Sequence, residues 1–524
     1  MTKHYSSGRA LHEKILEGVN ELADNVAATL GPRGRNVILH KKDAMPIVTK
    51  DGVTVAGFVE FEDPIKNTAA QIIKQVASNT NTLAGDGTTT STVLTRAVLQ
   101  EAQKYLIAGL PPVELKRGMD KAVEVLCECL TDMAVPVSSE EDIKHIATVS
   151  ANGDRKIGEL IAMAADQAGK DGAITVQDGK SIDTTLDLVE GFRFDSGYFS
   201  KSFVTDERRG LVKYDSPLVL VTDHKIDTVE SILPVLELVA RDSRPLVIVA
   251  EEVEGQALAA MIMNAVRGTL KVAAIKAPRY GQERRNILKD LCVSVGATFV
   301  SRESAMSLGD VELTHFGKCD RIEVSKSSTT IVGGKGDVDL VDERIESLKE
   351  EIRDTNDLTE GERIQERIVR LASGIAIIKV GGMTEVEMIE RKHRIEDALE
   401  AVKAAQESGL VPGGGVALIR AAQEAREKIT TDNEHQQIGA EIVLECIKSP
   451  LRQMAQNAGL SPDLIYNKVA AADQNEGCDI ATGEITNLVE SGVVDPAKVT
   501  MTALQNAISA ASTLITTNNA IVEC

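Results

Sequence analysis

The spacing of apolar residues changes twice along the chain, from helical to β-rich and back to helical. This alternation limits the folds that the chain can adopt. Apolar residues recur every three or four positions from Leu11 to Leu30, and alanine-rich helical patterns return after Gly409. Between these parts, short β-rich runs appear from Ala173 onward and several of them alternate with helical patterns, which predicts an α/β layer between roughly Glu190 and Ser373. The predicted strands are Ile174–Val176, Leu218–Thr222, Leu246–Ala250, Val272–Ile275 and Thr298–Val300. We therefore expect a multidomain chain of α and α/β parts.

Four local patterns predict further elements. Two extended runs suggest a hairpin, a second long helix starts after a glycine-flanked acid, two charged helices form a helical hairpin, and Thr384 with Glu387 forms a capping box. The helix opened by this box ends at Gly409. The hairpin consists of Asn36–Leu39 and Ile47–Thr49 around a turn at Lys41–Pro46. The second long helix follows Gly85-Asp86-Gly87, and the two charged helices lie within Glu343–Leu371.

The chain has an excess of acidic residues. Lys and Arg number 58 against 79 Asp and Glu, which gives a formal net charge of −21. A field of this sign repels nucleic-acid backbones and anionic membranes. Aromatic residues make up only 3 % and Trp is absent, so a base-stacking surface has little material and the cores must be filled by Ala, Val, Ile and Leu. We expect neither nucleic acid nor a membrane as partner.

The number and spacing of cysteines and histidines exclude some classes of protein. The seven cysteines are odd in number and lack CxxC spacing, and the eight histidines form neither HxxxH nor HExxH, which argues against disulfide and zinc frameworks. The first twenty residues lack the apolar core of a secretory signal. The longest uncharged stretch, Val499–Val522, has apolar residues at helical spacing, which favours an amphipathic helix over a membrane span. We expect a cytoplasmic protein.

Three glycine-rich elements could bind a phosphate group: Thr29–Gly34, Gly85–Thr90 and Gly413–Gly415. Neither GxxxxGK[ST] nor GxGxxG occurs. In the second element, glycines flank Asp86 and three threonines open a helix, whose N-terminus favours an anion. A carboxylate beside hydroxyls suits Mg²⁺ together with a phosphate. Each element alone is more often a turn, a cap or a connector, so only the set indicates a nucleotide site.

Two further acids could take part in the chemistry. Asp51 stands beside Lys50 directly after an extended run, and Asp397 lies in mid-helix next to the apolar positions Ile395 and Ala398. An acid at the border of an apolar stripe usually faces water. The spacing alone therefore leaves the role of Asp397 open.

Eight motifs occur in one order along the chain. They are TLGPRGRNV (Thr29–Val37), TKDGVTVA (Thr49–Ala56), AGDGTTTSTVL (Ala84–Leu94), KAPRYG (Lys276–Gly281), MTEVEM (Met383–Met388), RIEDAL (Arg394–Leu399), PGGGVAL (Pro412–Leu418) and VVDPAKVT (Val493–Thr500). On these residues the chain closely resembles the group I chaperonins, the GroEL-like 60 kDa chaperonin family, over essentially its whole length.

The resemblance implies a GroEL-like chaperonin fold of three domains. A mainly helical equatorial ATPase domain would comprise residues 1–132 and 409–524, and a small α/β intermediate hinge domain residues 133–189 and 374–408. An α/β apical substrate-binding domain, residues 190–373, would be inserted in the middle. The two chain ends would then fold together.

The resemblance also implies roles for individual residues. Asp86 would hold Mg²⁺, Asp51 and Lys50 would lie near the γ-phosphate, and Asp397 would orient the attacking water. Asp479 and Ile480 occupy the positions of an Asn-Ala pair that usually faces adenine, and Asp495 would bind the ribose. The other implied nucleotide contacts are Thr29, Leu30, Gly31, Pro32, Gly87, Thr88, Thr89, Thr90, Gly413 and Gly414.

A capture surface for non-native chains would lie on two apical helices, 230–242 and 254–268, which carry more apolar residues than one buried stripe needs. Without the resemblance, burial on both sides is the simpler interpretation. Ser202 stands where the family usually has a second aromatic residue. The implied surface residues are Tyr198, Phe203, Leu233, Leu236, Leu258, Ile262 and Met263.

The resulting hypothesis is an ATP-dependent molecular chaperone that captures non-native polypeptides and promotes their folding in a ring cavity. The implied cofactors are ATP, Mg²⁺ and K⁺, and the implied assembly is a homo-oligomeric heptameric ring, stacked as a double ring. Whether a GroES-like co-chaperonin closes the ring is left open. Two other classes remain: a small-molecule kinase or ATPase, and an interaction scaffold that binds proteins without cycling. Solution mass separates them from a ring, because seven copies of the 56.2 kDa chain weigh about 393 kDa and fourteen about 787 kDa.

Overall fold

The computed structural model describes residues 3–41, 46–168, 173–179, 181–304, 306–354, 358–372 and 374–523. Residues 42–45 of the predicted turn, Ser373 and Cys524 lie outside this range. The chain folds into two compact units. Unit 1 comprises Met1–Met163, Asp178–Asp183 and Val380–Cys524, and unit 2 comprises Ala164–Gln177 and Thr184–Lys379. The division of the chain into three domains stays a prediction.

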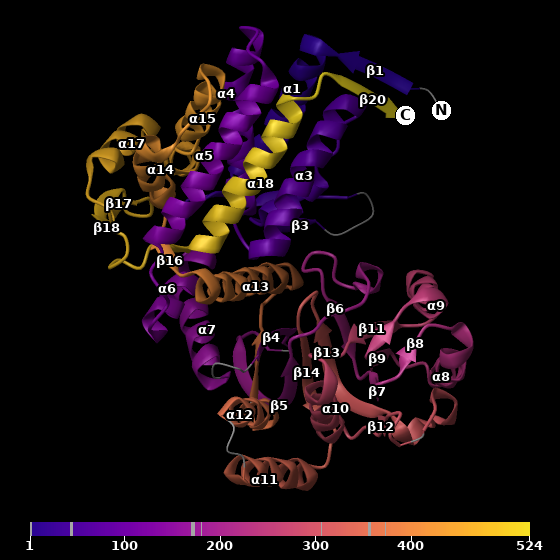
Figure 1. Ribbon diagram of the computed structural model, residues 1–524. Coiled ribbons are helices and arrows are strands. Elements are labelled where there is room, and N and C mark those ends of the chain that lie inside the picture. Colours follow the sequence, from indigo (N-terminus) through magenta and orange to yellow (C-terminus); the bar gives the residue numbers. More distant parts are fainter. Residues whose placement is uncertain are drawn as a thin grey trace. The chain divides into compact units, whose positions relative to one another are not determined.

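Unit 1 is mainly helical and is built from both ends of the chain. In Figure 1 the C-terminal helix α18 runs alongside α3, α4 and α5 from the N-terminal part, and contacts between these helices agree. The helices are α1 (Gly8–Ala27), α2 (Gly52–Phe58), α3 (Pro64–Ala84), α4 (Thr88–Ile107), α5 (Pro112–Met133), α6 (Glu140–Ser150), α7 (Arg155–Ala168, which continues into unit 2), α13 (Glu385–Ser408), α14 (Val416–Lys428), α15 (Glu434–Cys446), α16 (Ser449–Asn457), α17 (Pro462–Ala471) and α18 (Ala497–Ile515).

The main core of unit 1 consists of aliphatic side chains from both chain ends, among them Leu22, Leu94 and Leu504. Its buried members within the described residues include no aromatic ring, as the composition predicted. Each fully buried Leu of this kind stabilises the fold by about 2 kcal/mol relative to an exposed position. A smaller cluster around Val416, Met454 and Ile480 lies between α14, α16 and α17.

In the described part of unit 1, four two-stranded antiparallel sheets accompany the helices. One joins the two ends of the chain, with Tyr5 opposite Ile521, and another is the predicted hairpin. A third places Asp495 opposite Val411 and so fixes the segment before α18 against the segment before α14. The pairs are β1 (Lys3–Ser7) with β20 (Asn519–Glu523), β2 (Val37–Leu39) with β3 (Ile47–Thr49), β16 (Leu410–Pro412) with β19 (Val494–Pro496), and β17 (Glu476–Asp479) with β18 (Glu484–Asn487).

Unit 2 is an α/β layer around one mixed sheet. The sheet has the order β11-β9-β7-β13-β14-β5-β15-β4, with β12 and β6 attached to β7 and β13. β7, β9 and β11 pair in parallel and are almost wholly buried, as their unbroken apolar runs predict. Its strands are β4 (Ala173–Asp178), β5 (Thr185–Phe194), β6 (Val212–Asp215), β7 (Leu218–Thr222), β9 (Leu246–Ala250), β11 (Val272–Lys276), β12 (Phe299–Val300), β13 (Gly317–Val324), β14 (Thr329–Gly334) and β15 (Gly374–Val380).

Within the described residues, unit 2 holds five further α-helices and a small separate sheet (Figure 1). The predicted charged helical hairpin is present, and its helices pack on α10 through a buried charge cluster. Asp290 of α10 accepts two hydrogen bonds from Arg367, at 2.7 and 3.0 Å, and one from Arg344 at 2.9 Å. The helices are α8 (Val229–Asp242), α9 (Gly255–Val266), α10 (Gly281–Val295), α11 (Val338–Asp354) and α12 (Leu358–Ala372), and the small sheet pairs β8 (Lys225–Ile226) with β10 (Glu252–Val253).

The five predicted strands and the predicted hairpins and helices are confirmed, with boundary differences of a few residues. Sequence analysis did not predict β5, β13, β14 and β15. Charged residues interrupt the apolar pattern in β5 and β13, and threonines and glycines flank the short apolar run of β14. Among the described residues, no helix combines the length and the apolar character that crossing a bilayer requires.

Candidate nucleotide site

Unit 1 contains a cavity of about 730 Å³, whose lining comes from segments up to about 470 residues apart in the sequence. Of the residues predicted to bind nucleotide or to act in catalysis, all line this cavity except Gly413. The predicted residues that line it are Thr29, Leu30, Gly31, Pro32, Lys50, Asp51, Asp86, Gly87, Thr88, Thr89, Thr90, Asp397, Gly414, Asp479, Ile480 and Asp495.

The first segment is the turn after α1. Gly31 has a φ of +82°, and a Cβ at this position would lie 2.7 Å from Met454, so the turn requires glycine. The side chain of Asn457 on α16 donates to the carbonyls of Ala27 and Leu30, both at 2.9 Å. These bonds tie the N-terminal turn to the C-terminal part of the chain.

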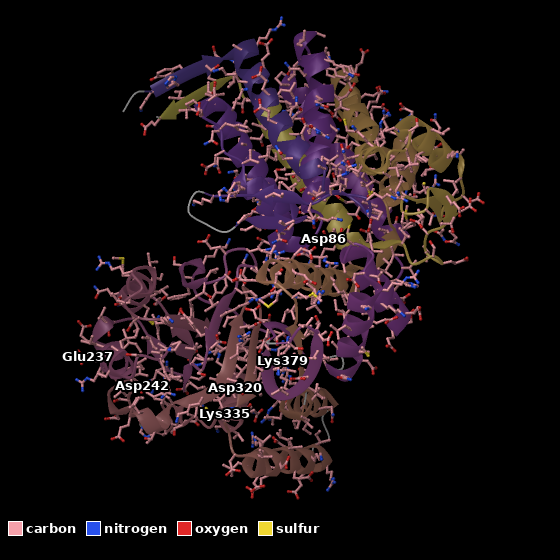
Figure 2. The ribbon with its side chains drawn as sticks, turned by 180° about the vertical axis from the view of Figure 1, so that it is seen from behind. Asp86, Glu237, Asp242, Asp320, Lys335 and Lys379 are labelled. Carbon is pink, nitrogen blue, oxygen red and sulfur yellow. The ribbon has the colours of Figure 1, made fainter. Side chains whose placement is uncertain are left out.

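The second segment connects α3 to α4 and contains Asp86. Gly85 ends α3 in the left-handed region at φ +74°, and Gly87 caps α4 at φ +83°. A Cβ on Gly87 would meet Val499 of α18 at 2.8 Å, and one on Gly85 would collide with Glu400 of α13. Figure 2 labels Asp86 at this end of the helices of unit 1. The N-terminus of α4 therefore opens into the cavity with Thr88, Thr89 and Thr90 as its first turn.

The carboxylate of Asp86 has one hydrogen-bond donor on each oxygen. The N–H of Gly87 donates to Oδ1 at 2.5 Å and the hydroxyl of Ser150 donates to Oδ2 at 3.1 Å. Burial raises the pKa of Asp86 above its ordinary value, and these two donors act in the opposite direction. The nearby charge of Asp51 raises the pKa further.

The third segment, Lys50 to Gly52, packs directly against the threonine turn. A Cβ on Gly52 would lie 2.5 Å from the hydroxyl of Thr89 and 2.7 Å from that of Thr88. Asp51 is the N-cap of α2, since its carboxylate accepts from the backbone N–H groups of Val53 and Thr54, both at 3.2 Å. Sequence analysis did not predict this capping role.

The fourth segment combines the glycine triplet with Asp495. Gly414 and Gly415 have φ values of +64° and +76° and lead into α14. Gly413 follows β16 directly, and its N–H donates at 2.9 Å to the carbonyl of Val493, which directly precedes β19. Gly413 is not among the residues that line the cavity. Burial raises the pKa of Asp495 to about 7, the charge of Asp86 adds to this rise, and the N–H of Gly414 opposes it.

The two residues predicted to contact adenine, Asp479 and Ile480, line the cavity at the tip of the β17–β18 hairpin. The carboxylate of Asp479 accepts from the N–H of Ala481 at 2.8 Å and from the hydroxyl of Thr482 at 3.2 Å, so it holds its own turn. Ile480 is buried in the smaller cluster of unit 1. Arg33 donates to the carbonyl of Ala481 at 2.8 Å and links this turn to the first segment.

Asp397 comes from α13, which passes along the cavity. One turn earlier, Arg394 forms ion pairs with Glu390 at 2.8 Å and with Asp154 at 3.3 Å. Burial lowers the pKa of Lys50, the charge of Glu390 opposes this effect, and the charge of Arg394 adds to it. α13 begins at the predicted cap, where Thr384 accepts from the N–H of Glu387 at 3.2 Å.

Sequence analysis missed one wall of the cavity. This wall is formed by α6 and the turn that follows it, with Lys144, His145, Thr148, Ser150 and Asn152 among the lining residues. The dipeptide Asn152-Gly153 was the available signal, because both residues have positive φ values, +58° and +86°, of the kind that Asn and Gly tolerate.

The donor set fits a magnesium-bound phosphate group. Two half-buried carboxylates with raised pKa values, Asp86 and Asp495, lie in one cavity, and a divalent cation would offset their charge. Within the described residues no three His, Cys, Asp or Glu side chains are grouped to hold a metal by themselves. Mg²⁺ usually takes one or two carboxylates and completes its shell with phosphates and water.

Asp495 leads to a prediction on pH. Its pKa of about 7 lies above the ordinary value of 3.8, so the folded chain holds this proton more tightly than the unfolded chain. The resulting stabilisation is complete below pH 3.8 and is lost as the pH rises through 7. Without nucleotide, Asp495→Asn should therefore gain stability over the wild type between pH 5 and 8, by on the order of 2 kcal/mol.

Thermal unfolding of both proteins across this pH range tests the prediction. Glu484→Gln, a change at an exposed acid of the same unit, serves as the control and should follow the wild type. A difference in stability between Asp495→Asn and wild type that stays constant from pH 5 to 8 would contradict the raised pKa of Asp495.

In unit 2 the residues of the predicted capture surface divide into two groups. Met263 is 49 % exposed and Leu233 is also exposed, whereas Tyr198, Leu258 and Ile262 are half-buried. Phe203 and Leu236, 1 % and 7 % exposed, are in the core, so the expectation that they lie on the surface is corrected. Val266, 68 % exposed, lies one turn after Met263 on α9 and was missed.

The architecture defines a class of protein: a helical unit that both chain ends build around a phosphate-type cavity, with an α/β unit inserted between them, is a chaperonin-type fold. The sequence pattern of the TCP-1/cpn60 chaperonin family matches residues 22–524. The chain belongs to this family and is accordingly an ATP-dependent molecular chaperone.

The fold is similar to that of a solved chaperonin. The solved structure is that of the chaperonin gp146 from the bacteriophage EL 2 (Pseudomonas aeruginosa), determined in the presence of ATP-BeFx. The sequences are 22 % identical, the match covers 99 % of both chains, and the TM-score is 0.67.

Proposed function

We propose that the chain hydrolyses ATP in the cavity of unit 1 and uses this cycle to bind and release non-native polypeptides. The observation that carries the proposal is that Asp86, the threonine turn and Asp397 line one cavity, although they come from distant parts of the sequence. The structurally similar chaperonin gp146 was crystallised in the presence of ATP-BeFx, which supports nucleotide binding by this chain.

Different residues of the chain would bind the phosphates, the metal, the attacking water, the base and the ribose. The N-terminus of α4, with Thr88 to Thr90, would bind the phosphates, and Asp86 would hold the metal. Lys50 would contact the γ-phosphate, and Asp397, together with Asp51, would orient the attacking water and accept its proton. The turn at Asp479 and Ile480 would contact the base, and Asp495 the ribose. Gly413 would act indirectly, by holding Gly414 in place.

Mg²⁺ would supply charge neutralisation on the phosphates during hydrolysis. The residues present fit this ion, as argued above. K⁺ stays a prediction, and no residue is assigned to it.

The capture surface in this proposal is the apolar face shared by α8 and α9, formed by Leu233, Leu258, Ile262, Met263 and Val266. Tyr198 lies on a preceding loop and is half-buried. Met and unbranched or flexible side chains suit a surface that accepts varied partners, because they can repack. Exposed Glu237, labelled in Figure 2, lies one turn after Leu233 on α8.

Leu233→Ser combined with Met263→Ser should weaken the binding of a denatured protein about tenfold. Both side chains are exposed, so the melting temperature should change little. Leu236→Ser is the matched comparison on the same helix and should cost about 2–5 kcal/mol of stability, because its side chain is buried.

The measurement is the binding of a fluorescently labelled chain diluted from denaturant, with thermal unfolding recorded for each variant. Undiminished binding by the double variant would rule out this surface.

Homo-oligomer formation is supported by two small sheets of unit 1. β1–β20 exposes Tyr5 and Ile521, and β2–β3 exposes Ile38 and Ile47. Two-stranded sheets are marginal alone, and their open edges are templates for pairing with another chain. We propose that these strands lie against a second copy of the chain in a ring, which the resemblance to the group I chaperonins implies to be heptameric and stacked as a double ring.

Light scattering of the purified chain tests the assembly. A mass of about 393 or 787 kDa supports it, whereas a 56.2 kDa monomer that hydrolyses ATP would instead support the small-molecule kinase or ATPase alternative. Bound protein that is not released on addition of ATP would support the interaction scaffold. A cytoplasmic location and a lid co-chaperonin stay predictions.

A further inference from the structure

α6 links the two halves of the candidate site. It begins with a capping box, in which Ser139 accepts from the N–H of Asp142, and it ends at Ser150. Along its length it packs against α13, which carries Asp397, and against β19, which carries Asp495. Nothing in the sequence patterns assigned a role to this helix.

The C-terminal end of α6 is held in one conformation by backbone hydrogen bonds. The N–H of Ala151 donates to the carbonyl of Ala147 at 2.9 Å, and that of Gly153 donates to Thr148 at 2.8 Å. Asn152 and Gly153 both adopt left-handed conformations, which close the helix end. The backbone that carries Ser150 is therefore held by hydrogen bonds of the residues that directly follow it.

This hydroxyl contacts the acid that would hold the metal. Ser150 Oγ donates to Asp86 Oδ2 at 3.1 Å, while the N–H of Gly87 donates to the other oxygen. Two donors on opposite oxygens fix the plane of the carboxylate, and each oxygen keeps a further lone pair. Outer partners of this kind hold a metal ligand in orientation, and their loss typically costs 10- to 100-fold in metal affinity.

We propose that Ser150 is a positioning residue for the magnesium-nucleotide site. Its hydroxyl orients the Asp86 carboxylate and connects that acid to α6, which packs on the helix of Asp397. This inference rests on the proposed ATP site. In this role Ser150 itself makes no contact with the nucleotide.

The test compares Ser150→Ala with Ser150→Thr in the full-length protein. The readout is the Mg²⁺ concentration needed for half-maximal binding of a fluorescent ADP analogue, which requires no turnover. Ser150→Ala should raise this concentration about tenfold and leave nucleotide binding without Mg²⁺ unchanged. Ser150→Thr keeps the hydroxyl and should stay close to the wild type.

Ser139→Ala is the matched control, because it removes the cap at the other end of the same helix without touching Asp86. An unchanged Mg²⁺ requirement in Ser150→Ala, or an equal rise in Ser139→Ala, would overturn the positioning role while leaving the ATP site intact. Absence of nucleotide binding by the wild type at every Mg²⁺ concentration would instead overturn the proposed function, and the role of Ser150 with it.

Discussion

Asp397→Ala should lower ATP turnover by at least about 100-fold while the affinity for ATP stays within about twofold. The reason is the position of the side chain, which lines the cavity from α13 and not from the glycine turns or the α4 terminus. In the proposed function those backbone elements bind the phosphates, and the substitution leaves them intact. Single-turnover hydrolysis and equilibrium binding of ATP, measured side by side, separate the two effects.

Glu385→Ala provides a control on the same helix, because this acid is exposed in the first turn of α13, far from Asp397 in sequence. It should turn over ATP at the wild-type rate. A parallel loss of affinity and turnover in Asp397→Ala would mean that the acid binds nucleotide and has no separate role in hydrolysis.

Asp86→Asn should lower the affinity for magnesium-nucleotide by at least about 100-fold and, without nucleotide, raise the stability of the fold by on the order of 1 kcal/mol. The two effects have one origin. Burial raises the pKa of Asp86, so its charge is unfavourable in the empty cavity and useful only when a cation is bound. The amide of Asn removes the charge but preserves an acceptor for the N–H of Gly87.

Binding titrations with and without Mg²⁺, together with thermal unfolding of the unliganded protein, measure both effects. Asp120→Asn changes an exposed acid on α5 and should alter neither quantity. A variant that binds magnesium-nucleotide like the wild type would exclude Asp86 as the metal ligand.

The local elements of this protein were largely predictable because their signals are local. The repeat of apolar residues in α1, the apolar runs of β7 and β9, and the cap at Thr384 each involve neighbours in the sequence. β5, β13 and β14 were missed because their strand character depends on partners elsewhere: Arg193 and Glu323 belong to strands only through pairing across the sheet.

The candidate site was predictable where a turn requires glycine, and less so where burial or a capping contact, such as that of Asp51, decides. Leu236 and Met263 have similar sequence surroundings, yet one is in the core and the other is half exposed, because neighbouring elements cover only one of them. Ser150 gave no signal either, since a serine at a helix end is ordinary until its partner is known.

The sequence alone determined which turns could approach a phosphate group and which helices and strands could form, because these depend on glycine conformations, caps and apolar periodicity within a few residues. Only the tertiary structure decided that Asp86, Asp397 and Asp495 share one cavity and that the Ser150 hydroxyl meets Asp86. Bringing groups together from separated segments depends on the packing of α18, α13 and α6 against the N-terminal helices and one another, and no short stretch of sequence encodes that packing.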